Sequence, residues 1–242
     1  MDIPSRLSSS LSGPADTCRR CGSCCREGGP TLHLADRESV EKGLLPAHDL
    51  VTLRVGERVY DNFTGCLILS QREMIKIRGK GADWSCMYFD SGTRSCGIYD
   101  QRPVQCRVQK CWDPAEAAAL SREPGLTRVD LLGEVAGLWD LISEHERRCA
   151  YSAVSEMADH LYRNPSSTAC TQRIQEMTAY DAALRQTLRE RLGAKADTLD
   201  FLLGRPLVDT LPGFGFTLHP GPRDRTRIGF SIRRYQSLIQ KS

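Results

Sequence analysis

Four cysteines fall within eight consecutive residues, and this block restricts the fold more than any other feature of the sequence. It reads Cys18-Arg-Arg-Cys21-Gly-Ser-Cys24-Cys25. Cysteines three residues apart in a tight turn can direct their sulfurs to one side, where they converge on one metal or cluster. Gly22 suits such a turn because glycine tolerates positive φ. The block therefore predicts a metal centre held by thiolates.

A second group of cysteines follows at longer spacing. We expect it to supply further metal ligands together with the first block, so that the predicted set is Cys18, Cys21, Cys24, Cys25, Cys86, Cys96, Cys106 and Cys111. Neighbouring side chains usually project in different directions, so Cys24 and Cys25 either serve two different metals or include one buried non-ligand. The number of centres stays open.

The chain of 242 residues contains 11 cysteines, an odd number that excludes a complete set of internal disulfides. The first residues lack the apolar stretch of a secretory signal, and no apolar run reaches the roughly 18 residues of a membrane span. We therefore expect a protein of the reducing cytoplasm, where dense cysteines indicate metal or redox chemistry. The formal net charge of +3 is too small to indicate nucleic-acid binding.

The cysteines are concentrated in the first half of the chain, and the second half has helical spacing of apolar residues. We predict an α+β protein with three parts: a flexible leader over 1–17, an irregular, metal-stabilised domain with short strands over 18–112, and a mainly helical domain with a terminal β-hairpin over 113–242. Metal ligands from two distant segments would close a long loop and couple metal binding to folding.

Several elements can be predicted individually. In the first part we expect a strand over Met74–Ile77 and a hairpin over Met87–Tyr99 whose loop spans 90–94. In the second part we expect an alanine-rich helix after Pro114 that ends near Pro124, further helices over Thr127–Arg148, Ala150–Tyr162, Ser167–Leu192 and Thr198–Leu203, and a hairpin within Leu207–Ile232.

Three further residues are predicted to support the bound metal or cofactor. Pro103 suits the first turn of a helix that carries Cys106, and Arg102 and Arg107 lie four residues before Cys106 and Cys111. A four-thiolate site is negatively charged, so these guanidinium groups would offset its charge and donate hydrogen bonds to sulfur. Tyr99 could hydrogen-bond a sulfur or a substrate. Surface ion pairing for the arginines and simple packing for Tyr99 are the alternatives.

The block Cys18 to Cys25, followed by Cys86 and then Cys96-x-Ile-Tyr-x2-Arg-Pro-x2-Cys-Arg-x3-Lys-Cys111, resembles the CxxCxxCC (YkgJ-type) cysteine-cluster family. The resemblance covers about Cys18 to Trp112 and implies zinc or iron chelation. The cysteine motif is also similar, more weakly, to that of the flagellin lysine-N-methylases, although no motif for S-adenosylmethionine can be assigned here.

Zinc and iron–sulfur clusters both accept four thiolates. The all-cysteine donor set and the three-cysteine turn favour an iron–sulfur cluster, which could act as a redox or protein-modifying centre. A zinc-stapled interaction module and a metal-trafficking protein are the alternatives. No G-x-G-x-x-G, P-loop, G-x-S-x-G or H-E-x-x-H motif is present, so catalytic residues are unknown. We expect a protein or small-molecule partner of unknown identity, with no nucleic acid and no membrane. Cys66 is better explained as a core residue than as a ligand.

Overall fold

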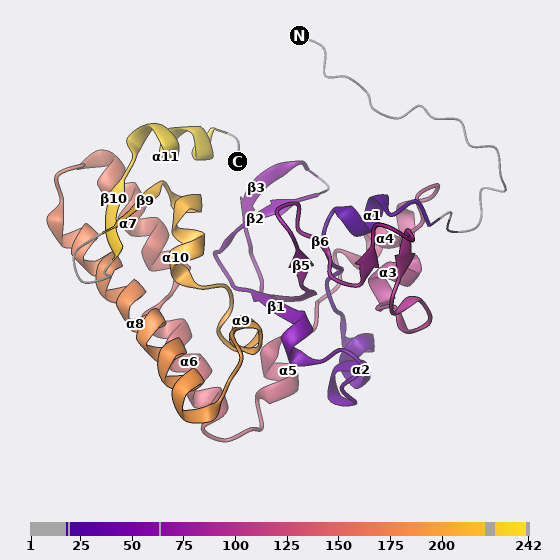
Figure 1. Ribbon diagram of the computed structural model, residues 1–242. Coiled ribbons are helices and arrows are strands. Elements are labelled where there is room, and N and C mark those ends of the chain that lie inside the picture. Colours follow the sequence, from indigo (N-terminus) through magenta and orange to yellow (C-terminus); the bar gives the residue numbers. More distant parts are fainter. Residues whose placement is uncertain (1–17, 19, 63, 221–225, 241–242) are drawn as a thin grey trace, which may run out of the picture.

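The computed structural model describes residues 18, 20–62, 64–220 and 226–240, so the predicted leader lies outside the described residues. The described chain is α+β, as predicted: short antiparallel strand pairs and small helices fill one side, and longer helices fill the other (Figure 1). No helix among the described residues is long and apolar enough to cross a membrane.

The N-terminal part consists of very short elements. Its helical turns are α1 (Ser23–Arg26), η1 (Leu34–Asp36), α2 (Arg37–Glu41), η2 (Ala47–Asp49), η3 (Tyr99–Gln101) and α3 (Val104–Val108). Its strands are β1 (Leu50–Leu53), β2 (Arg58–Asp61), β3 (Cys66–Leu69), β4 (Met74–Ile77), β5 (Gly79–Lys80), β6 (Ser85–Cys86), β7 (Phe89–Asp90) and β8 (Ser95–Cys96). They pair as β1–β4, β2–β3, β5–β6 and β7–β8, all antiparallel.

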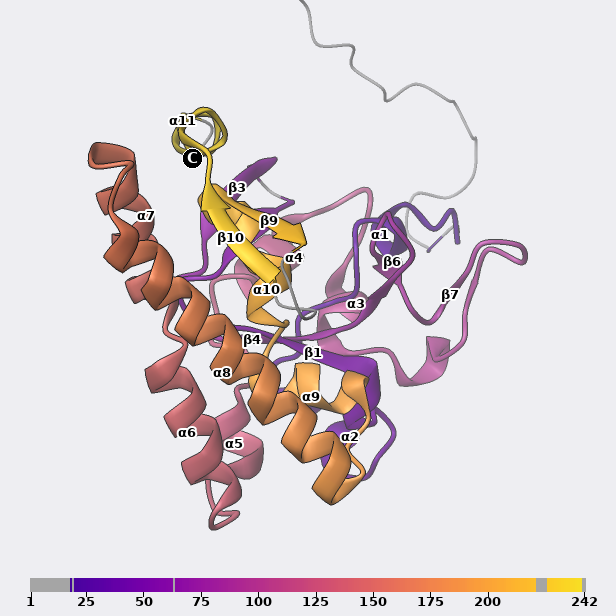
Figure 2. The same ribbon diagram turned by 60° about the vertical axis from the view of Figure 1, so that its left-hand side comes forward.

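The C-terminal part is dominated by helices. These are α4 (Ala115–Leu120), α5 (Arg128–Leu132), α6 (Leu138–Arg148), α7 (Tyr151–Arg163), α8 (Thr168–Leu192), α9 (Ala196–Leu203), α10 (Leu207–Thr210), η4 (Leu211–Phe214) and α11 (Ile232–Ile239). The strands β9 (Phe216–Pro220) and β10 (Thr226–Phe230) form one antiparallel pair. Figure 2 shows α8 running along the edge of the molecule, away from α1 and α3.

Several predicted elements are confirmed. The strand over Met74–Ile77 is β4, and the predicted 90–94 loop joins β7 to β8. Gly193, in the left-handed conformation at φ 64°, ends α8. Pro103 directly precedes α3, where its fixed φ suits the start of a helix.

Two predictions in the helical half were wrong. The helix after Pro114 ends at Leu120, well before Pro124. The predicted Thr127–Arg148 helix is two helices, α5 and α6, because Gly137 has φ 76° and interrupts the spiral. Val129 and Val135, which supported the single helix, are half exposed.

The predicted hairpin begins too early and is not the last element. Leu207, Leu211 and Phe214 are spaced four and three residues apart and are all buried, so this stretch forms α10 and η4 rather than a strand. Pro206 immediately before α10 suits that helical start. The strands begin at Phe216, and α11 packs after them.

The two parts share one hydrophobic core. Leu32, Leu50, Ile75 and Ile77 of the N-terminal part pack with two residues of the C-terminal part, Leu126 and Phe201. A second cluster lies within the helical half and joins α7 and α8 to η4, β9 and β10. The Thr52 hydroxyl also donates to the Phe201 carbonyl oxygen at 2.6 Å, which fixes β1 on α9.

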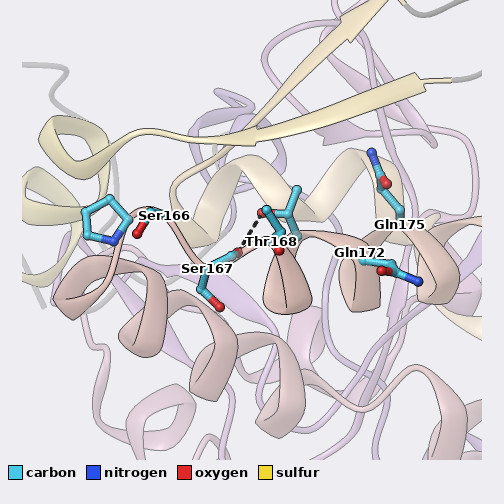
Figure 3. A pocket seen from close by; sticks show the side chains of 7 residues that line it. Ser166, Ser167, Thr168, Gln172 and Gln175 are labelled. Carbon is cyan, nitrogen blue, oxygen red and sulfur yellow. Dashed lines mark hydrogen bonds between the residues drawn. The ribbon is translucent and has the colours of Figure 1, made fainter.

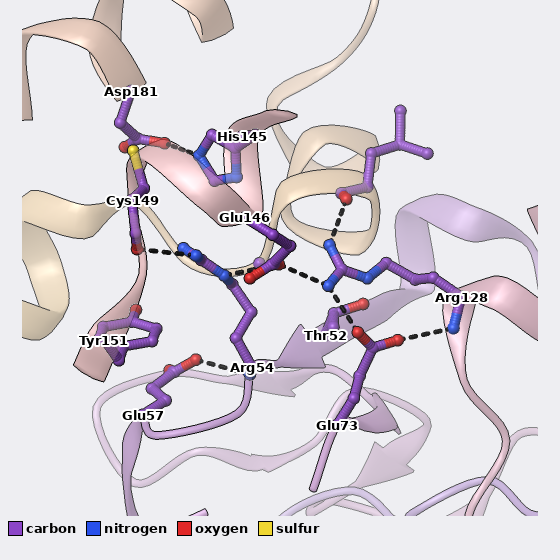
Figure 4. Close-up of polar contacts among 12 residues, drawn as sticks. Thr52, Arg54, Glu57, Glu73, Arg128, His145, Glu146, Cys149, Tyr151 and Asp181 are labelled. Atoms are coloured by element: carbon purple, nitrogen blue, oxygen red, sulfur yellow. Dashed lines mark hydrogen bonds and ion pairs between the residues drawn. The ribbon is translucent and has the colours of Figure 1, made fainter. Parts of the chain in front are cut away.

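A buried network of charges joins the same two parts (Figure 4). Arg54 and Arg128 are each 1% exposed, and both donate to Glu146 Oε1, from Nε at 2.7 Å and from Nη2 at 2.6 Å. Arg128 Nη2 also donates to Glu73 Oε2 at 2.6 Å. Burial alone would raise the pKa of Glu146, but the two arginines outweigh it and lower that pKa.

A second buried set of polar groups orders the helical half. Asp181 accepts hydrogen bonds from His145 Nε2 at 2.8 Å, Arg185 Nε at 3.0 Å and the Leu207 backbone at 2.9 Å. Burial lowers the pKa of His145, so its neutral form donates to the Asp181 carboxylate. These bonds fix α8 against α6 and α10.

Replacing Glu146 with Ala should destabilise the protein by about 3–5 kcal/mol, because two buried arginines would lose their shared carboxylate. Glu144→Ala is the matched control on the same helix. Glu144 pairs with Arg147 and Arg148 at the surface, and such pairs contribute at most about 1 kcal/mol. Urea unfolding of both variants, prepared with the same metal content, measures the difference. Equal losses would contradict the role given to the buried network.

Candidate metal centre

The eight predicted ligands lie on elements that gather on one side of the molecule. Cys24 and Cys25 are in α1, which packs against β6, the strand that carries Cys86. Figure 1 shows α1, β6 and α3 close together on this side. The remaining ligands are placed just before α1, in β8, in α3 and just after α3, at Cys18, Cys21, Cys96, Cys106 and Cys111.

The eight thiols differ in exposure. Cys18, Cys21, Cys24 and Cys111 are exposed. Cys86 is buried, and Cys25, Cys96 and Cys106 are half-buried. Cys25 and Cys86 pack with Phe89 in the core that the two parts of the chain share. The cluster therefore has one side in the protein interior and one side in solvent.

The half-buried thiols lie close enough together for their charges to shift one another's pKa values. Burial, followed by the negative charge of Cys86, Cys24 and Cys96, raises the pKa of Cys106 to about 12. The pKa of Cys25 is lowered because the Cys24 thiol donates a hydrogen bond to it, and Cys86, Cys106 and Cys96 oppose this shift.

The exposed thiols affect one another in the same way. Burial raises the pKa of Cys111, and Cys24, Cys21 and Cys18 raise it further. Hydrogen bonds from the Ser23 hydroxyl and backbone N–H lower the pKa of Cys21, and its Sγ lies 3.3 Å from Ser23 Oγ. Each of the eight cysteines is therefore close enough to at least one other for their charges to interact.

The donors fit a thiophilic metal. Among the described residues, no three His, Cys, Asp or Glu side chains already have metal-coordinating placement, so coordination would draw the sulfurs closer. The groups that most affect Cys25, Cys106 and Cys111 are other cysteines and Arg102. A sulfur-only donor set suits zinc or an iron–sulfur cluster and disfavours magnesium or calcium.

Gly22 explains how the first cysteine block turns. Its φ is 78°, a conformation that side chains with a Cβ rarely adopt, and a Cβ here would lie 2.2 Å from Phe89 Cζ. The Arg26 guanidinium covers the same ring at 5.2 Å and donates to the Cys21 carbonyl oxygen at 3.2 Å. The Phe89 ring is therefore the surface on which the turn rests.

Asp36 fixes the helix that carries Cys106. Its carboxylate is 2% exposed and accepts from the backbone N–H of Val104 at 2.9 Å and of His33 at 3.0 Å. Gln105, next to Cys106, accepts a hydrogen bond from the Thr31 backbone through its side-chain oxygen. Sequence reasoning missed Asp36, because nothing in its local pattern indicates a partner 68 residues away.

Two lysines beside the thiols were also missed. Burial lowers the pKa of Lys76, and the charges of Cys106 and Cys86 oppose that shift, so both thiols lie near enough to act on its amino group. Lys80 Nζ donates to the carbonyl oxygens of Met87 at 3.1 Å and Phe89 at 2.6 Å. The available signal for Lys80 was a cation between two glycines close in sequence to Cys86.

The predicted supporting residues occupy different environments. Arg102 stacks on the Tyr99 ring at 3.6 Å, and Arg20 covers that ring at 4.8 Å. Arg102 also lowers the pKa of Cys106, which places its charge near that sulfur. Arg107 is exposed on α3. Tyr99 is thus a platform for two arginines, and its proposed bond to a sulfur or substrate remains a prediction.

The other cysteines lie on different elements. Cys66 is half-buried in β3, opposite Asp61 of β2. Cys149 is fully buried, with Sγ 3.7 Å from the Met177 carbonyl oxygen, and burial raises its pKa to about 12. Cys170 packs against the core of the helical half.

A separate hollow opens beside the start of α8 (Figure 3). Hydroxyl and amide side chains line it, among them Ser166, Thr168, Gln172 and Gln175. None of the predicted site residues lines this hollow. The geometry therefore points to the cysteine group as the candidate site.

Taken together, the coupled thiols, their arginine and lysine neighbours and the short elements define a cysteine-rich, metal-chelating domain. Residues 17–124 match the family model CxxCxxCC, described as a "Putative zinc- or iron-chelating domain". For this part of the chain, the match supports the family that the cysteine pattern predicted. The match continues through α4, past the predicted domain boundary at 112.

One curated relative is similar to the chain. It is the uncharacterized protein MJ0661 of Methanocaldococcus jannaschii, which is 30% identical over 99 residues. The match covers 41% of this chain and 46% of that protein, so the chain spans less than half of its length. No solved structure matches the chain significantly.

Gly22→Ala should destabilise the protein by about 2 kcal/mol and reduce its metal content, because Ala is strained at this φ and its Cβ would clash with Phe89. Gly97→Ala is the control in the same region. Its Cβ would meet only the Tyr88 carbonyl oxygen, at 3.7 Å. Thermal unfolding and elemental analysis measure both effects. Equal behaviour of the two variants would refute the proposed close packing at Gly22.

Asp36→Ala should cost about 2 kcal/mol or more, because two buried backbone N–H groups would lose their acceptor. Metal content should also fall, since α3 would lose the contact that positions Cys106. Asp100→Ala, at an exposed position of η3, is the control and should change stability by about 0.5 kcal/mol or less. Unchanged metal content in a destabilised Asp36 variant would show that this carboxylate does not position the site.

Proposed function

We propose that this chain is a metalloprotein of the reducing cytoplasm that binds iron–sulfur through cysteine thiolates, with ligands drawn from Cys18, Cys21, Cys24, Cys25, Cys86, Cys96, Cys106 and Cys111. The observation that carries the proposal is the mutual electrostatic influence of eight thiols from separate elements. When bound, a cluster would supply one-electron redox chemistry or Lewis acidity.

Contacts to sulfur support an iron–sulfur cluster. The Tyr88 backbone N–H donates to Cys86, and the Ser23 backbone N–H donates to Cys21. Such N–H···S bonds, together with burial, tune the reduction potential of a cluster. Lys76 and Arg102 would offset part of the negative charge of the thiolates. In this role Arg102 acts through charge near Cys106, and the same role is proposed for Arg107 near Cys111.

The exposure of one side of the site supports a class of reaction. A redox centre with exposed thiols on one side suits electron transfer with a protein partner or the modification of a protein or small molecule. The aromatic ring of Tyr99, with its two arginines, would form the rim that such a partner or substrate meets. Arg102 and Tyr99 are therefore the residues whose replacement should affect turnover without removing every thiolate.

Zinc is the second candidate, and one feature favours it. The N-terminal part consists of two-stranded pairs and single helical turns, and such short elements gain stability from a structural metal. In that case the metal supplies folding energy, and the helical half is the surface that binds a partner. Loose metal binding would instead indicate trafficking.

Anaerobic purification followed by iron, sulfide and zinc analysis tests the proposal. We expect a brown protein with visible absorption bands and an electron paramagnetic resonance signal after reduction. Cys21→Ser or Cys106→Ser should lower the iron content, whereas Cys170→Ser, in the helical core, should leave it unchanged. A colourless protein with stoichiometric zinc would replace the iron–sulfur assignment with the zinc module. A protein without bound metal would refute both.

A further inference from the structure

The eight thiols divide into two sets of four when they are sorted by exposure. The four exposed cysteines are Cys18, Cys21, Cys24 and Cys111, and the four buried or half-buried ones are Cys25, Cys86, Cys96 and Cys106. We call these the outer set and the inner set. Each set contains the number of thiolates that one zinc ion or one four-iron cluster requires.

The elements that carry the thiols support the same division. Cys25 and Cys86 pack in the shared core with Phe89, and Cys96 lies directly opposite Phe89 in the β7–β8 pair. Outside this core, Cys18 and Cys21 precede α1, and Cys111 follows α3. Three cysteines of the outer set therefore lie outside the helices and strands, and three of the inner set pack with Phe89 or lie opposite it. Cys24 in α1 and Cys106 in α3 are assigned by their exposure.

Electrostatic neighbours agree with this sorting. Apart from its hydrogen bond with Cys24 and its burial, the groups that act on the pKa of Cys25 are Cys86, Cys106 and Cys96. Cys111 is affected by Cys24, Cys21 and Cys18. Cys24 also acts on Cys86 and Cys106, so the two sets touch at the adjacent residues Cys24 and Cys25.

We propose that the cysteines form two adjacent centres: a structural inner centre held by Cys25, Cys86, Cys96 and Cys106, and a solvent-accessible outer centre held by Cys18, Cys21, Cys24 and Cys111 that exchanges its metal or reacts with a partner. This division rests on the proposed function as a thiolate metalloprotein. It does not depend on whether the metal is zinc or iron.

The two centres have different surroundings. Cys25 and Cys86 of the inner one pack with Phe89 in the core, and Cys96 and Cys106 are half-buried, so we expect water and chelators to reach it slowly. The outer one consists of exposed cysteines, and Arg26 of α1 beside it donates to the Cys21 carbonyl oxygen rather than to a sulfur. Its four sulfurs remain accessible, and so would a metal bound to them.

The test uses the full chain loaded with Zn²⁺ alone and challenged with an excess of a chromophoric chelator. We expect two zinc ions per chain, one released at least about tenfold faster than the other, because exposed sites open without unfolding of the core. N-ethylmaleimide added at each time point, followed by tryptic peptide mass spectrometry, identifies the freed thiols. Cys24 should be labelled in the fast phase and its neighbour Cys25 in the slow phase.

Double variants separate the centres. Cys21→Ser with Cys111→Ser should remove the fast phase and retain one slowly released zinc and the thermal stability. Cys86→Ser with Cys96→Ser should abolish the slow phase, and Cys66→Ser should preserve both phases. Where the inner variant fails to fold, the labelling of wild-type Cys24 and Cys25 decides the question.

Two results would overturn the division. One is labelling of Cys24 and Cys25 with the same time course, and the other is loss of all zinc in the outer double variant. Either result leaves the proposed metalloprotein function intact, because zinc is still bound by the wild type. Stoichiometric two-phase zinc release from a chain that carries no iron when purified anaerobically would instead refute the iron–sulfur assignment and support two centres.

Discussion

Mutual repulsion between thiolates is the constraint on which the rest of this site depends. Each cysteine that loses its proton makes the next harder to ionise, and this repulsion adds to the effect of burial in raising the pKa of Cys106 to about 12. A bound cation removes that penalty, and the cationic side chains of Lys76 and Arg102 reduce it further. Positive charge from the protein and from a bound metal would therefore both stabilise the same thiolates.

The scaffold resists this repulsion through contacts that lie outside the cysteine motifs. Phe89 supports the turn at Gly22, and Asp36 holds the start of α3, so the two ligand-bearing segments keep their positions independently of each other. Behind them, Arg54 and Arg128 share Glu146 and fix the N-terminal part to the helices. Buried charges of this kind restrict how two surfaces can dock, because any shift leaves an arginine without its carboxylate.

The sequence predicted what local pattern can encode. Turn residues around Asp90 predicted the β7–β8 hairpin, and Gly193 predicted the end of α8, because each signal lies within a few residues of its effect. The spacing of the cysteines likewise predicted the family. Interactions across long separations were missed, such as the hydrogen bond from the Val104 backbone to Asp36 and the charges of Cys86 and Cys106 that act on Lys76. The exposure of each cysteine also could not be predicted from its neighbours in the sequence. Cys24 and Cys25 are adjacent, yet Cys24 is exposed while Cys25 packs on the core, and only the fold determines this difference.

The shared hydrophobic core has a consequence for how the family segment is used. Residues 17–124 stop just short of Leu126 and well before Phe201, two of the side chains that complete the core around Leu32 and Ile75. If that segment were produced alone, it would expose an apolar face, and Arg54 would lack its carboxylate partner Glu146. The segment that the family model matches is thus recognisable in the sequence but does not contain a complete hydrophobic core. In any protein that carries it, its folding depends on the core residues that the rest of that chain contributes.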